Sequence, residues 1–133
     1  CFKVAYSFYT LCMHTTMRFS CKVHTPMYDC NNKKYIRFVI SDDVKQRVQF
    51  AQSRYQLKER HQDNPLEGNV LTVKIPFKYR RVMCTFEGVP TQSLKKDDPV
   101  DVDILFMGMW TYGEYCGYSW KLSYIKSVNN YIV

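Results

Sequence analysis

The chain has 133 residues, 46% of them hydrophobic and 23% charged, and a formal net charge of +7 at pH 7. This length is that of one domain with a core that needs no disulfide staples. No apolar run in this sequence approaches the ~18 residues of a membrane span. The basic excess suits nucleic acid or an acidic membrane surface. Of these we expect nucleic acid, with no membrane partner.

The first third of the chain is predicted to form three strands. Residues 2–11 and 15–25 are rich in Val, Tyr, Phe and Thr, and in the second range apolar and polar residues alternate with a period of two. Pro26 and the polar cluster at 29–32 predict a turn. Residues 35–40 alternate again, so we expect a third half-buried strand.

A helix and a loop are expected next. Ser41 is a good N-cap residue, and the two aspartates after it lie near the positive end of the helix dipole. Apolar residues then recur at spacings of four, three and four from Val44 to Tyr55, which predicts one helix ending at about Arg60. Residues 61–68 contain Asn, Pro and Gly and predict a loop.

The remaining residues favour strands. Residues 69–79 alternate, although Pro76 requires an edge position, a bulge or a bend between two strands. Residues 82–86 are expected to continue the sheet, and 87–99 to form a long exposed loop.

A hairpin is predicted to end the chain. Its strands span residues 100–112 and 118–128, the turn falls within 113–117, and Gly108 marks a bulge or a barrel corner. These elements predict a mainly β fold with one helix, which we interpret as an OB-like small β-barrel. A β-sandwich and an open antiparallel α+β sheet are the alternatives. The chain begins with Cys1 instead of methionine, which indicates a processed product or part of a longer protein.

Positive charges and aromatic rings interleave between Lys74 and Trp120. Cations contact a phosphate backbone and rings stack on unpaired bases, so this pattern favours single-stranded nucleic acid. For Trp110 and Trp120 a position in the core is an equal alternative, which makes the tyrosines near the turn the stronger candidates. The residues expected to bind are Arg37, Lys74, Lys78, Tyr79, Arg80, Arg81, Trp110, Tyr112, Tyr115, Tyr118, Trp120 and Lys121.

Metal binding is a weaker interpretation of the cysteines and histidines. Cys12, His14, Cys21, His24 and Cys30 crowd together, but their spacing matches no usual zinc motif. On the predicted strand, Cys21 and His24 would also face opposite sides. We expect no metal, no cofactor, and reduced thiols in an intracellular protein.

Catalysis has one candidate cluster, formed by Asp97, Asp98, Asp101 and Asp103. Paired aspartates can hold magnesium for phosphoryl chemistry, and Asp101 and Asp103 share one face of their strand. No histidine or lysine accompanies them at a recognisable spacing. We therefore expect a binding protein without enzymatic activity, and the alternative is a protein-interaction or viral assembly module.

The closing hairpin resembles that of viral and phage single-stranded DNA-binding proteins. Residues 100–110 (VDVDILFMGMW) and 117–122 (GYSWKL) carry the likeness, which extends over roughly residues 69–127. The resemblance implies an OB fold, sequence-independent binding of single-stranded DNA in viral replication or recombination, and self-association. It favours DNA over RNA and implies an intracellular location, the host nucleus or the site of viral DNA replication.

Overall fold

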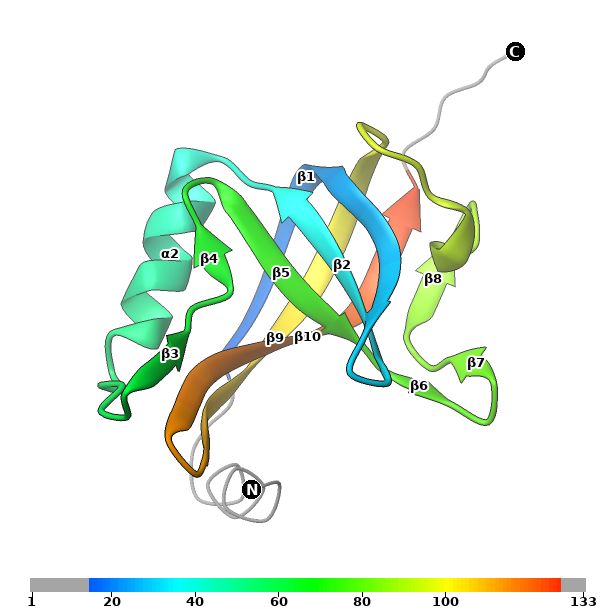
Figure 1. Cartoon of the computed structure of the whole chain (residues 1–133). Helices are drawn as coiled ribbons and strands as arrows, with labels where there is room; N and C mark the ends of the chain where they lie inside the picture. Colours follow the sequence, from blue (N-terminus) through cyan, green and yellow to red (C-terminus); the bar gives the residue numbers. More distant parts are fainter. Residues whose placement is uncertain (1–14, 128–133) are drawn as a thin grey trace.

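The computed structural model describes residues 15–127 (Figure 1). The strand expected at residues 2–11 and two of the possible metal ligands, Cys12 and His14, lie outside the described residues. The elements are β1 (Thr15–Cys30), β2 (Lys33–Val39), α2 (Asp42–Gln52), β3 (His61–Asp63), β4 (Leu66–Glu67), β5 (Val70–Ile75), β6 (Phe77–Lys78), β7 (Arg81–Val82), β8 (Thr85–Glu87), the 3₁₀ helix η1 (Thr91–Ser93), β9 (Pro99–Tyr112) and β10 (Tyr115–Ser127).

Five strands pair in a closed ring. β1 pairs antiparallel with β2 and β9, β2 pairs antiparallel with β5, and β9 pairs antiparallel with β10. A parallel contact between Lys121 of β10 and Lys74 of β5 joins the two ends of this path (Figure 1). The edge of β10 that faces away from β9 also pairs with β3 and β8. Over residues 15–127, the predicted mainly β fold with one α-helix is confirmed.

The core lies inside the ring. Alternate residues of the strands point inward, and Val23, Phe38, Val73 and Ile104 are fully buried. Val44, Val48 and Ala51 of α2 belong to the same cluster. The predicted alternation in 15–25 and 35–40 is thus confirmed.

The helix begins where the sequence predicts but ends early. The Oγ of Ser41 accepts a hydrogen bond from the backbone N–H of Val44 at 3.2 Å, which is the expected N-cap. The helix ends at Gln52, so the prediction of a helix to Arg60 is wrong. The chain turns after Gln52 and places the ring of Tyr55 5.7 Å from that of Phe106. The last apolar residue of the predicted stripe therefore packs on β9 from a turn.

The turn between β1 and β2 is shorter than predicted. β1 continues through Pro26, in a stretch where its register with β2 shifts twice. Asn31 and Asn32 alone form the turn, with φ of 52° and 65°. Asparagine tolerates this left-handed conformation better than most residues, so two residues suffice to reverse the chain.

Three other boundaries were predicted incompletely. The loop expected at 61–68 contains β3 and β4, because its backbone pairs with β10 and β5. Residues 82–86 do not form one strand, since β7 pairs with β6 while β8 pairs with β10. The segment 87–99 includes η1 and a fully buried Thr91. The bend at Pro76 is confirmed, since this residue separates β5 from β6.

The closing hairpin is confirmed, but its turn is shorter than the predicted 113–117. Only Gly113 and Glu114 form it, because β10 begins at Tyr115, three residues before the predicted start. Gly108 has a φ of 93° and lies beside a register shift between β9 and β10, as expected for a bulge. Between residues 15 and 127, no helix is long and apolar enough to cross a membrane.

Candidate nucleic-acid interface

Three lysines meet on the outer surface of the ring. Lys74 of β5 lies opposite Lys121 of β10 in the contact that closes the ring, and both are half-buried. Partial burial lowers the pKa of Lys74, and the nearby positive charges of Lys33 and Lys121 lower it further. Within residues 15–127, no salt bridge joins Lys74 or Lys121 to an acidic side chain. We call Lys33, Lys74 and Lys121 the lysine cluster.

This crowding predicts a measurable gain in stability when one charge is removed. The pKa of Lys74 is lower in the folded protein than its usual 10.5, so folding disfavours its charged form. The cost is complete below the folded pKa and disappears as the pH rises past 10.5. We expect Lys74→Gln to increase the free energy of unfolding by roughly 0.2–0.5 kcal/mol at pH 7 and low salt. Urea denaturation at pH 7 and again near pH 11, where the gain should vanish, tests this.

Two tyrosines lie beside the lysine cluster on the same outer surface. Tyr35 of β2 is the register partner of Lys74, and its ring centroid lies 5.8 Å from that of Tyr28 on β1. Partial burial raises the pKa of both phenols, so both are neutral at pH 7. Sequence reasoning missed Tyr28, Tyr35 and Lys33 as site residues. The alternation of β2 was the available signal for Tyr35, because it directs this side chain outward.

Arg37 points to the same surface but is already paired. Its Nη2 donates to Oε1 of Glu67 at 3.0 Å, while its buried Nε has no partner within the described residues. Partial desolvation raises the pKa of Asp63, and the nearby negative charge of Glu67 raises it further. β3 and β4 therefore form an acidic border to the lysine cluster, and Arg37 contributes less free positive charge than the sequence suggested.

A short hairpin of β6 and β7 follows Pro76 in the chain and is seen at the lower right of Figure 1. Its two turn residues are Tyr79 and Arg80, with φ of 51° and 62°. Neither residue favours this left-handed conformation, which costs on the order of 1–2 kcal/mol for each. The turn nevertheless displays an aromatic ring that is 85% exposed, flanked by the exposed cations Lys78 and Arg81.

The tip of the β9–β10 hairpin carries a second exposed aromatic group. Tyr112 and Tyr115 face each other across the turn and are 67% and 54% exposed. The ring of Tyr115 stacks on that of His61 from β3, with centroids 4.8 Å apart and an interplanar angle of 28°. This contact supports one side of the Tyr115 ring, so it holds the ring in a defined orientation.

Trp120 lies in the core and not on the outer surface, so its predicted binding role is wrong. The side chain is 1% exposed, lies 4.7 Å from the ring of Phe106, and donates from Nε1 to Oε1 of Gln52 at 3.0 Å. The core alternative is therefore correct for this tryptophan. A ring enclosed in this way cannot stack on a base.

Tyr118 and Trp110 also have structural contacts. The hydroxyl of Tyr118 donates to the backbone carbonyl of Tyr55 at 2.6 Å. Trp110 is half-buried across from Gly117, where an added Cβ would lie 2.8 Å from Cζ2 of the indole. Both side chains are committed mainly to packing, and Tyr112 and Tyr115 are the remaining stacking candidates on this hairpin.

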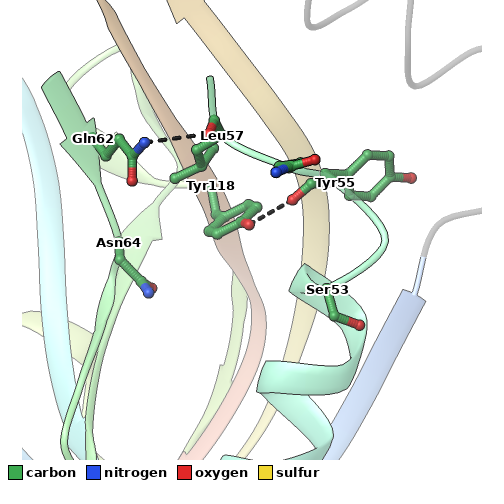
Figure 2. A pocket seen from close by; sticks show the side chains of 7 residues that line it. Ser53, Tyr55, Leu57, Gln62, Asn64 and Tyr118 are labelled. Carbon is green, nitrogen blue, oxygen red and sulfur yellow. Dashed lines mark hydrogen bonds between the residues drawn. The ribbon is translucent and has the colours of Figure 1, made fainter. Parts of the chain in front are cut away.

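A shallow pocket of about 450 Å³ opens beside Tyr118, between the end of α2 and β3 (Figure 2). The side chain of Gln62 donates to the carbonyl of Leu57 at 3.2 Å across it. None of its lining side chains is ionised at neutral pH, so the pocket is unsuited to binding phosphate. Its lining residues are Ser53, Tyr55, Gln56, Leu57, Gln62, Asn64 and Tyr118.

Two of the four carboxylates singled out as a possible magnesium site have other partners. Asp103 accepts two hydrogen bonds from Arg18, at 2.5 and 2.8 Å, and these lower its pKa. Asp101 accepts one from Ser20 at 2.5 Å. These contacts link β1 to β9. Within the part of the chain that the structure describes, no three potential metal ligands gather.

The described cysteines are free thiols. Cys21, Cys30, Cys84 and Cys116 form no disulfide with one another. Burial is the main cause that raises the pKa of Cys21, to about 12, so this side chain is a neutral thiol that packs against the core.

The surface groups follow one another along the chain. The outward face of β10 leads from Lys121 to Tyr115, a rise of about 20 Å at the usual spacing of strand residues. From Lys74, the chain leads within four residues to the β6–β7 hairpin.

Comparisons of this chain with family models, curated proteins and solved structures find no match.

Proposed function

We propose that this protein binds single-stranded nucleic acid without catalysis and without strong sequence preference. The observation that carries the proposal is the lysine cluster, in which Lys74 and Lys121 have no acidic partner within residues 15–127 and which lies between two hairpins with exposed tyrosines. Lysines there would contact phosphates while Tyr79, Tyr112 and Tyr115 stack on bases. Stacking does not distinguish DNA from RNA, and the hairpin resemblance favours DNA, in viral replication or recombination.

The order of strands in the ring supports an OB-like barrel as part of this proposal. Counted along the chain, the ring strands are β1, β2, β5, β9 and β10, and their spatial order is β1-β2-β5-β10-β9. OB folds bind oligonucleotides on the face of their second and third strands and with the loops between strands one and two and between four and five. β2 and β5 hold these positions here, and they carry Lys33 and Lys74.

Fluorescence anisotropy with a labelled oligo-dT of ~30 nucleotides tests the proposal. We expect binding that weakens steeply with salt, with a slope of about −0.7 for each phosphate contacted, because cations on the protein release counterions. A duplex of equal length should not displace the single strand. Absence of binding at low salt would overturn the proposed function.

The β6–β7 turn provides a test in which stability and binding change in opposite directions. Replacing Tyr79 and Arg80 together with Asn and Gly supplies residues that favour this turn. We expect the double variant to be more stable by about 1–2 kcal/mol, provided that the hairpin unfolds with the rest of the domain. Its affinity for oligo-dT should fall. Thermal denaturation and anisotropy measure the two effects, and unchanged affinity would remove the hairpin from the binding surface.

A second candidate function is protein interaction, as a partner-binding or viral assembly module. Phe77, Met83 and Phe86 are exposed within ten residues of sequence, on and beside β6 and β8. Exposed apolar side chains that lie close together favour contact with another protein. Sedimentation velocity at low and high salt distinguishes the two functions, because apolar self-association would survive salt that releases nucleic acid.

A further inference from the structure

We propose that the lysine cluster is a discrete phosphate-binding site, formed by Lys33, Lys74 and Lys121. Its ligand is a phosphate group, from the backbone of a bound strand or from a free polyphosphate. The inference rests on the proposed function and deepens it, because it assigns the phosphate contact to one place on the surface.

The geometry of the ring creates this site. The cluster brings together β2, β5 and β10, three strands that are far apart in the sequence. Lys74 and Lys121 are register partners across the closing contact, and Lys33 lies close enough for its positive charge to lower the pKa of Lys74. Because all three are half-buried, their ammonium groups have less freedom to separate than fully exposed lysines would.

Like charges held this close repel one another unless an anion lies between them. Lys74 and Lys121 have no acidic partner within residues 15–127, whereas Lys34 is paired with Asp29 at 2.6 Å. Asp63, the acidic residue of β3, interacts electrostatically with Tyr28 and Tyr35. An anion is therefore favoured at the lysines and disfavoured towards β3.

The neighbouring rings indicate how a nucleotide would fit. Tyr35 lies next to Lys74 in the register of β2 and β5, and Tyr28 lies on its other side. A phosphate held by the lysines would place the attached sugar and base within reach of these two rings. The site thus has a cationic part and an aromatic part, as a subsite for one nucleotide of a strand requires.

The test compares the double variant Lys74→Gln, Lys121→Gln with the control variant Lys96→Gln. Lys96 is an exposed lysine in the loop before β9, so the control changes charge away from the site. We expect the double variant to bind oligo-dT at least about tenfold more weakly and to show a shallower salt slope. The control should change affinity less than about twofold. A Lys→Arg version of the double variant should retain most binding.

Thermal shift with sodium tripolyphosphate provides the second measurement, and it does not depend on the oligonucleotide. The anion should raise the melting temperature of the wild-type protein and the control, and have little effect on the double variant. If oligo-dT binds equally well to the double variant and the control, the lysine cluster is not the phosphate site, although the proposed function stands. If tripolyphosphate alone binds, and only when the lysines are present, the phosphate site stands and the proposed function fails.

Discussion

Replacing Trp120 with alanine should destabilise the protein by about 3–5 kcal/mol, the usual cost of deleting a buried indole. The side chain is 1% exposed and packs on Phe106, so its removal leaves a cavity inside the ring. The variant also removes the donor to Gln52, itself a buried polar residue of α2. Equilibrium denaturation in urea measures the change, and the folded fraction should bind oligo-dT as well as the wild-type protein does.

Trp120→Phe separates the two contributions. This variant keeps most of the apolar volume and loses the hydrogen bond from Nε1 to Gln52, so its loss of stability should lie between zero and that of the alanine variant. A stable Trp120→Ala protein that no longer binds oligo-dT would contradict the core position of this ring. It would also restore the binding role that the sequence suggested.

The two possible positions of Trp120 show how far sequence reasoning reaches. Trp120 and Leu122 lie two residues apart on β10, so they share a face of the strand, and both are buried. Alternation does not state which face is inside, because an aromatic strand beside lysines suits a core and a binding surface equally well. The pairing of Lys121 with Lys74 determines which face of β10 is buried, because it directs these two side chains outward and the tryptophan inward.

The composition of the lysine cluster could not be predicted for a similar reason. Lys33, Lys74 and Lys121 are separated by more than forty residues at each step, and their meeting depends on how the strands close into a ring. For Arg37, the unpredicted neighbour is an acidic residue. Its partner Glu67 lies thirty residues away, so the sequence suggests a free cation where the structure has a salt bridge.

The short polar strand β3 was also not predicted. β3 consists of His61, Gln62 and Asp63, which have neither apolar alternation nor β-branched residues. These residues form a strand because β10 offers an open edge to their backbone. By contrast, the cap at Ser41 and the break at Pro76 depend on local chemistry. The cap was predicted, and a bend was one of the three outcomes predicted for Pro76.

The second large effect concerns Tyr115, whose ring stacks on that of His61 in β3. We expect Tyr115→Ala to weaken binding of oligo-dT by about 1–3 kcal/mol, roughly 5- to 150-fold, because one stacked base loses its ring. The melting temperature should change little, since the side chain is 54% exposed and its hydroxyl makes no hydrogen bond within residues 15–127. Anisotropy with the same labelled strand measures the affinity.

The salt dependence of binding identifies the physical cause of that loss. Tyr115→Ala removes no positive charge, so the slope of log affinity against log salt should stay that of the wild-type protein. Tyr115→Phe keeps the ring and its stack on His61, and should bind normally. Equal losses in the alanine and phenylalanine variants would assign the contact to the hydroxyl. Full affinity in both would remove the β9–β10 tip from the path of the strand and leave the lysine cluster and the β6–β7 hairpin as its contacts.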